Sequence, residues 1–155
     1  MKIISSISIL LLVLFINISC GSSKKALSAT EIKLMTTKQY DEPYDLVYKS
    51  TMSLLQSEQF TIEQTDYKTG LIIATKNVFK KKSATLAKGS IIVDKINDNL
   101  TEVKVTIYTG EQKTKRGYYG QKNTSKKEKM VEEPEYYSNW FNKLYAEIER
   151  RKALR

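Results

Sequence analysis

The sequence predicts an α+β domain, in which an antiparallel sheet of about five strands has two helices packed on one face, preceded by a signal peptide. Two stretches with apolar residues at helical spacing, near the two ends of residues 31–155, predict the helices. Between them, stretches that alternate apolar and polar residues are separated by short turn sequences, which is typical of antiparallel hairpins. A short apolar run that ends at Cys20 predicts the signal peptide.

The first 19 residues have the features of an export signal. Lys2 supplies a positive start, and an apolar run broken only by Ser and Asn extends from residue 3 to residue 18. The run is shorter than the roughly 20 apolar residues that span a bilayer comfortably. This favours a cleaved signal over the alternative, an uncleaved anchor helix.

Cys20 is the only cysteine, and it stands directly after this run. The stretch 16–20 resembles a bacterial lipobox, with Asn17 where Leu is usual; an ordinary secretory signal with an incidental cysteine is the alternative. The resemblance implies that Cys20 becomes the lipidated first residue of the mature chain, and several acyl chains anchor a protein stably. Residues 20–30 are expected to form a flexible tether and residues 31–155 a single domain.

The composition argues against the common kinds of enzyme. The chain has no histidine, which removes Ser-His and Cys-His nucleophile arrangements, imidazole metal sites and the commonest general base. Lipidation would consume the one thiol, and neither a P-loop nor a GxGxxG sequence is present. The carboxylates Glu132, Glu133 and Glu135 lie where a helix is predicted to begin and interact favourably with its dipole, and an acid/base pair is the alternative. We therefore expect a non-enzymatic protein without a cofactor or a metal.

The domain is expected to begin with a strand that runs from residue 31 to about Tyr40. The sequence Asp41, Glu42, Pro43 is a helix start signal, because it combines a side-chain acceptor, an acid and a proline in the first turn. The apolar face that follows predicts a helix ending near Ser57.

Four further strands are expected as two hairpins, at residues 60–65 with 71–75 and 90–96 with 100–109. The turn sequences between them contain Gly, Asn and Asp, which tolerate left-handed backbone conformations. Val103, Val105 and Ile107 alternate with polar residues, so the sheet is expected to have one buried face and one wet face.

The pattern of a strand, a helix opening at residue 41, then Phe60-Thr61-Ile62, Asp66-Tyr67-Lys68-Thr69-Gly70 and Leu71-Ile72-Ile73-Ala74 resembles a family of small envelope lipoproteins. It is similar to the helix-grip domains of the BamC type and covers about residues 31–109. The resemblance implies a scaffold or accessory role at an envelope complex, and it implies no catalytic residues.

A basic loop is expected at residues 110–130, with two adjacent tyrosines near its middle. Basic residues interleaved with aromatic ones suggest nucleic acid in a cytoplasmic protein, but export argues against such a partner. Anionic glycan, lipid head groups or an acidic protein surface are the expected contacts, and a long solvated hairpin or a disordered segment is the alternative. The candidate contact residues are Lys113, Lys115, Arg116, Tyr118, Tyr119, Lys126 and Lys127.

The final helix is expected to start at Pro134 and to carry a stripe of large apolar residues, including the only tryptophan. The stripe is expected to pack on the sheet as core, with a docking face as the alternative. The expected function is that of a lipid-anchored, non-enzymatic accessory or assembly lipoprotein that binds an envelope protein partner, at the outer membrane facing the periplasm. The alternative is a binder of an anionic glycan or lipid through the basic loop.

Overall fold

The computed structural model describes residues 26–80, 83–116 and 122–154, and the side chains at 26–78, 85–110 and 128–154. The predicted signal peptide, Cys20, Tyr118 and Tyr119 lie outside these ranges. The described chain forms nine elements in the order α2 (Ala29–Thr36), β1 (Thr37–Tyr40), α3 (Tyr44–Ser57), β2 (Thr61–Asp66), β3 (Leu71–Lys80), β4 (Ser83–Asn97), β5 (Leu100–Arg116), β6 (Lys122–Met130) and α4 (Pro134–Lys152).

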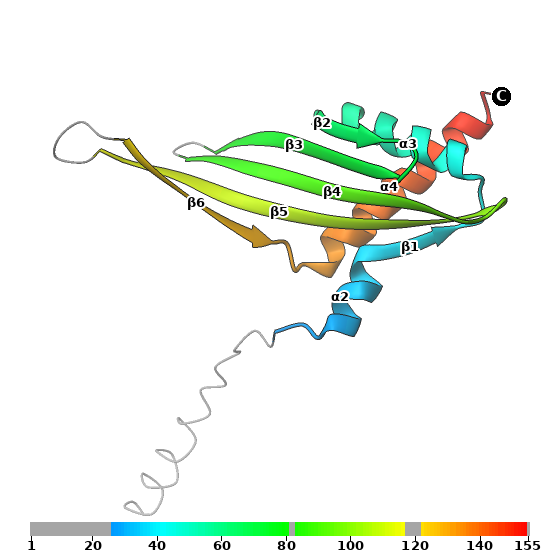
Figure 1. Ribbon diagram of the computed structural model, residues 1–155, viewed down its shortest axis with the longest axis horizontal. Coiled ribbons are helices and arrows are strands. Elements are labelled where there is room, and N and C mark those ends of the chain that lie inside the picture. Colours follow the sequence, from blue (N-terminus) through cyan, green and yellow to red (C-terminus); the bar gives the residue numbers. More distant parts are fainter. Residues whose placement is uncertain (1–25, 81–82, 117–121, 155) are drawn as a thin grey trace, which may run out of the picture.

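All described strands pair antiparallel in one sheet, in the order β1-β5-β4-β3-β2 (Figure 1). The sixth strand, β6, also pairs with β5, beyond the stretch that pairs with β1. Residues 101–104 of β5 face β1, and residues 108–116 face β6. Because β4 occupies the other side of β5, β1 and β6 share one edge of the same long strand.

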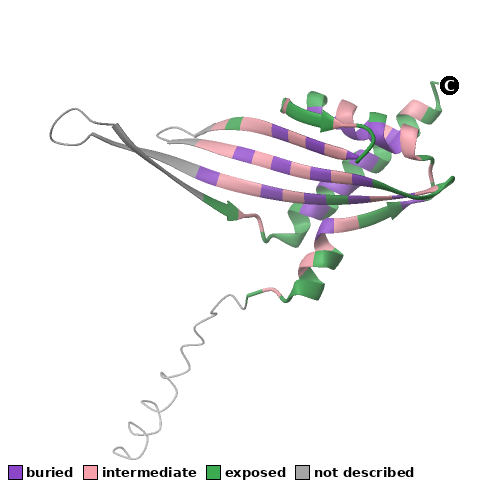
Figure 2. Cartoon of the chain, in the orientation of Figure 1, coloured by how far each residue is buried: buried purple, intermediate pink, exposed green. Residues whose placement is uncertain are grey.

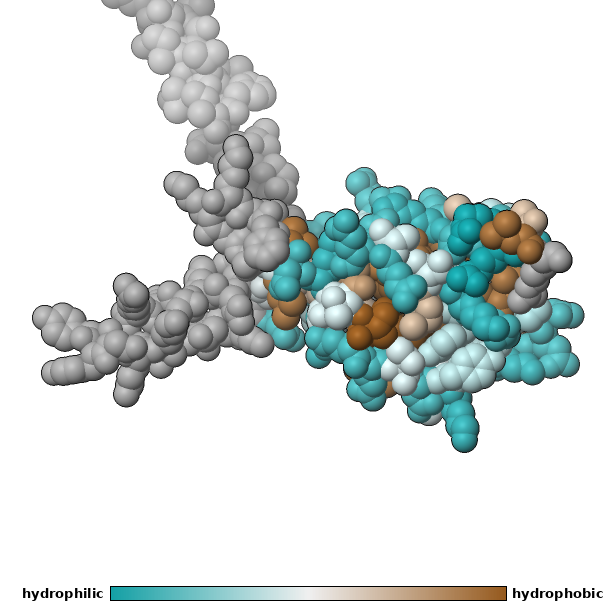
Figure 3. All heavy atoms as spheres, turned by 90° about the horizontal axis from the view of Figure 1, so that it is seen from above, coloured by the Kyte–Doolittle hydropathy of each residue, from teal (hydrophilic) through white to brown (hydrophobic). Residues whose placement is uncertain are grey.

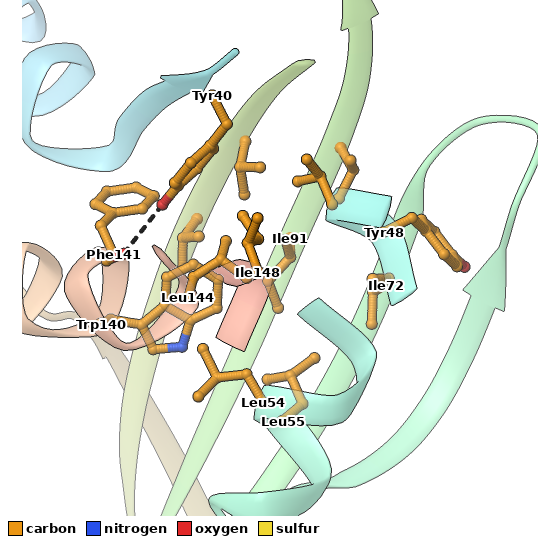
Figure 4. Packing of buried hydrophobic residues seen from close by; sticks show 14 of the residues in the cluster. Tyr40, Tyr48, Leu54, Leu55, Ile72, Ile91, Trp140, Phe141, Leu144 and Ile148 are labelled. Atoms are coloured by element: carbon orange, nitrogen blue, oxygen red, sulfur yellow. Dashed lines mark hydrogen bonds between the residues drawn. The ribbon is translucent and has the colours of Figure 1, made fainter. Parts of the chain in front are cut away.

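The core lies between this sheet and the helices α3 and α4, as the alternation of buried residues along the strands shows (Figure 2). Trp140, Leu144 and Ile148 of α4 pack with apolar residues of α3 and of the sheet (Figure 4). The Tyr40 hydroxyl donates to the Phe141 carbonyl at 3.1 Å and so ties β1 to α4. The predicted α+β class and the core role of the last helix are therefore confirmed.

The chain passes from β6 into α4 through a set of buried hydrogen bonds. The Val131 amide donates to the Ile107 carbonyl at 2.8 Å. The Tyr137 hydroxyl donates to the Val131 carbonyl at 2.8 Å and accepts from the Ile107 amide at 3.4 Å. These bonds fasten the end of β6 to the middle of β5.

The prediction of a strand from residue 31 was wrong, because residues 29–36 form helix α2 and only residues 37–40 form β1. The cause is a capping box. The Ser28 hydroxyl accepts from the Glu31 amide at 3.3 Å, and the Glu31 carboxylate accepts from the Ser28 amide at 2.7 Å. The domain thus has a third helix, and its order begins within the predicted tether.

The prediction of a loop at residues 110–130 was also wrong, since β5 runs to Arg116 and β6 spans residues 122–130. The two strands pair antiparallel as the two sides of a hairpin, and the contact role of this segment stays a prediction. Likewise, β3 and β4 extend to Lys80 and from Ser83, well beyond the predicted 71–75 and 90–96. Ladder hydrogen bonds join main-chain groups, so a polar sequence can continue a sheet that an apolar one began.

Candidate binding surfaces

The first candidate surface is the basic arm, which we define as residues 109–116 of β5 and 122–130 of β6. These two strands pair in continuous register from Tyr108 opposite Met130 to Arg116 opposite Lys122. The arm extends away from the helices at one end of the sheet (Figure 1). The only sheet partner of β6 in the described chain is β5, so the other edge of β6 is an edge of the sheet.

Cationic positions occur on both faces of the arm. Positions 103, 105 and 107 of β5 are buried against the core, and the strand alternation places 109, 111, 113 and 115 on the same face. The register places Lys127 opposite Glu111 on that face, and Lys126 opposite Gln112 on the other. An anionic partner could therefore contact either face.

The net charge of the chain is concentrated in this arm. Residues 109–130 contain seven Lys and Arg residues against two Glu residues, a net charge of +5. Residues 26–108 and 131–155 together contain 16 basic and 15 acidic residues, a net charge of +1. Clustered charge of one sign attracts an oppositely charged surface over about a Debye length, roughly 8–10 Å at physiological salt.

We call residues 26–108 and 131–155 the body. Many charges of the body are engaged with one another around α4. Glu147 accepts two hydrogen bonds from the Arg150 guanidinium, at 2.6 and 2.7 Å, and this contact holds the pKa of the carboxyl at about 2. Lys152 lies 2.6 Å from Glu42, and Lys143 lies 2.6 Å from Glu58. These pairs join α4 to the rest of the body.

The structure brings five of the seven sequence-predicted contact residues onto one hairpin. Lys113, Lys115 and Arg116 belong to β5, and Lys126 and Lys127 belong to β6. The remaining two, Tyr118 and Tyr119, lie outside the described residues, and so does the predicted lipidation site. A different interpretation of the lysines also fits, because lysine on an edge strand discourages sheet-to-sheet aggregation.

The second candidate surface is the face of the sheet opposite the helices, which the sequence analysis predicted only as a wet face. Leu71 of β3 pairs with Ile92 of β4, and Ile73 follows two positions along β3, so the three share this face. All three are half-buried. We call them the apolar strip.

Polar and charged residues surround the apolar strip. Lys104 pairs with Ile92, Ser90 pairs with Ile73, and Asp94 lies two positions beyond Ile92 on the same face. An apolar centre with a polar rim of mixed charge is the usual anatomy of a protein–protein interface. The face drawn in Figure 3 is mostly hydrophilic, with apolar atoms in small separate patches.

A cluster of tyrosines joins the turn between β2 and β3 to helix α3. The rings of Tyr44, Tyr48 and Tyr67 lie 5.1–5.7 Å apart by their centroids. The Tyr44 hydroxyl donates to the Tyr67 carbonyl, and burial raises its pKa to about 12. Gly70 has φ +70, and a Cβ there would lie 1.9 Å from the Val93 carbonyl oxygen, so only glycine fits. This cluster fixes the turn against the sheet.

In the part of the chain that the structure describes, no group of three or more His, Cys, Asp or Glu side chains is placed so that it could hold a metal ion. No helix in that part of the chain is both long and apolar enough to cross a bilayer. Neither a comparison with protein-family models nor a search of curated proteins found a match to this chain. The resemblance to helix-grip envelope lipoproteins therefore stays a prediction.

Proposed function

We propose that this chain is a lipid-anchored, non-enzymatic accessory protein of the cell envelope, and that it binds a protein partner through the apolar strip. The observation that carries the proposal is the exposed sheet face, where Leu71, Ile73 and Ile92 lie together inside a rim of mixed charge. In a two-layer domain the helices cover only one face of the sheet, so the other face has no covering layer. Burial of half-exposed apolar area against a partner is favourable, by about 25 cal/mol per Å².

The location belongs to the same proposal and is supported by the sequence. The apolar run ending at Cys20 supports export and lipid attachment, and the outer membrane facing the periplasm is the proposed site. The absence of histidine and the predicted loss of the only thiol support a non-enzymatic role. Acyl labelling of the native chain and of Cys20→Ala tests the anchor, and equal labelling of both would refute it.

The partner proposal is tested by co-purification from gently solubilised envelopes, comparing the native chain with Leu71→Lys. A lysine in the apolar strip should abolish a stoichiometric partner, because it places a charge in the centre of the contact. Leu34→Lys is the matched control, since Leu34 of α2 is 76% exposed and lies outside the strip. Retention of the partner by Leu71→Lys, or loss of it by both variants, would contradict the proposed surface.

A second candidate function is favoured by the separation of charge, and this is the binding of an anionic glycan or lipid through the basic arm. It predicts binding that weakens as the salt concentration rises, because dissolved ions screen the attraction between the basic arm and an anionic ligand. Binding of the strip to a protein partner depends mainly on apolar burial and should change less with salt. Partner recovery and lipid binding measured at low and high salt therefore separate the two candidates.

A further inference from the structure

The chain enters the domain beside the end of the basic arm that adjoins the body, at Thr109 and Met130. We call this end the root of the arm. Leu27, before helix α2, lines a groove of about 510 Å³ together with Thr109 of β5, Met130 of β6 and Pro134 of α4. The segment that leads toward Cys20 therefore leaves the body where the arm begins. The body lies on the far side of this junction (Figure 1).

The lengths of the two segments are similar. From Cys20 to Leu27 there are seven residue steps, which reach at most about 25 Å when fully extended. From Thr109 to Arg116 there are also seven steps, which span about 23 Å as a β-strand. A membrane that holds an acyl chain on Cys20 is therefore within reach of the outer part of the arm.

The distribution of charge favours contact between anionic lipid and the outer part of the arm, and disfavours contact at the root. Glu132, Glu133 and Glu135 border the groove at the root together with one cation, Lys129, so the net negative charge there disfavours anionic lipid. Beyond the root the sequence of the arm is strongly basic, and Lys24 and Lys25 add two cations next to the predicted anchor. The end of β3 adds Lys80, and the β3–β4 hairpin points toward the same end of the sheet as the arm (Figure 1).

We propose that the basic arm lies against the anionic phospholipid head groups of the membrane that holds the Cys20 anchor. This inference rests on the anchor part of the proposed function and deepens its second candidate by naming the ligand and its place. Each Lys or Arg near such a surface adds attraction. A tethered arm also meets the lipid at a high effective concentration, so a weak contact suffices.

The lipid anchor at Cys20 and the contact of the arm with lipid together fix the orientation of the body. The hydrogen bonds of Tyr137 and Val131 with Ile107 fasten the root of the arm to the core, so the arm does not pivot freely. An arm bound to lipid therefore holds the body at a set angle above the membrane. The nearly neutral body, with its apolar strip, then faces away from the head groups or along them, where a protein partner can reach it.

The test uses the acylated full-length chain in vesicles that carry a fluorescence acceptor on a small share of their head groups. A donor dye is attached at Thr114→Cys in the arm or, as a control, at Asn99→Cys in the β4–β5 turn at the other end of β5. In vesicles containing anionic phosphatidylglycerol the arm dye should be quenched strongly and the turn dye weakly. Uncharged phosphatidylcholine vesicles, or high salt, should reduce the quenching of the arm dye toward that of the turn dye.

Charge reversal provides the decisive comparison. Lys126→Glu with Lys127→Glu should reduce quenching of the arm dye to its level in phosphatidylcholine. Lys38→Glu with Lys68→Glu makes the same change in net charge at exposed body positions and should leave it unaltered. Quenching that is equal in both kinds of vesicle, or that survives arm reversal, overturns the inference while acyl labelling stands. A native chain without acyl label overturns the anchor and the inference together.

Discussion

The body and the basic arm are parts of one sheet, yet they are built on different principles. In the body, buried apolar residues recur at alternate positions of strands β3, β4 and β5, and two helices cover the buried side. In the arm the same β5 continues with β6 as its partner, with a polar and basic sequence. The comparison shows that main-chain pairing carries the sheet outward beyond the stretch that is rich in apolar residues.

The division also separates two uses of charge. Body carboxylates such as Glu147 are held by cations of the same helix, and the body is nearly neutral. The arm holds most of the net charge. Stability should therefore depend on residues of the body, and contact with anionic surfaces should depend on residues of the arm. The following predictions test that separation, beginning with the largest expected effect.

The largest difference is expected between a core leucine and an arm threonine. Leu144 of α4 is fully buried in the core with apolar residues of α3 and of the sheet. Leu144→Ala should therefore lower the free energy of unfolding by about 2–5 kcal/mol. Thr114→Ala in the arm should change it by no more than about 0.5 kcal/mol. Urea denaturation of both variants measures the contrast, and similar losses would show that the arm is part of the cooperative core.

The junction of the two regions should show an intermediate effect. Tyr137→Phe removes the hydroxyl that bonds Val131 and Ile107, and it leaves their buried main-chain groups without that partner. The expected cost is about 1–3 kcal/mol in the free energy of unfolding. Hydrogen exchange should speed up at the end of β6 more than in β4. Uniform acceleration across the sheet would mean that the junction is not a local fastening.

Much of the body could be predicted from the sequence because its signals are local. The apolar stripe of α4 and the alternation at Val103, Val105 and Ile107 each reflect burial on one face, and the structure confirms both. Helix α2 was missed because Ile32 and Leu34 suggested a strand, while the decisive signal was the spacing of Ser28 and Glu31. That capping box is visible in the sequence.

For the arm, the sequence predicted the basic composition but not the two paired strands. Its basic residues were identified, but no apolar alternation marks β6, whose pairing is set by its neighbour β5. The apolar strip was missed as a site for a different reason. Leu71, Ile73 and Ile92 come from two strands, and only the register shows that they adjoin on the face away from the helices. Such a surface depends on tertiary pairing, which local patterns do not contain.

The smallest effect is expected from pH, and it belongs to the body alone. The side chain of Glu147 is 14% exposed, and the Arg150 hydrogen bonds lower its pKa to about 2 in the folded state. The folded pKa lies below the ordinary value of about 4.3. The ionised Glu147 carboxylate therefore makes its full contribution to the free energy of unfolding above about pH 4.3. This contribution is lost as the pH falls from about 4.3 toward about 2.

We expect Glu147→Gln to lose about 1–2 kcal/mol of stability at pH 7 and little at pH 2. The free energy of unfolding of the variant should therefore fall less steeply with acid than that of the native chain. The matched control, Lys126→Gln with Lys127→Gln, should keep the native pH dependence, since neither lysine belongs to the body. If these arm variants flattened the pH dependence as Glu147→Gln does, the charges of the arm would act on stability, and the separation between the two regions would fail.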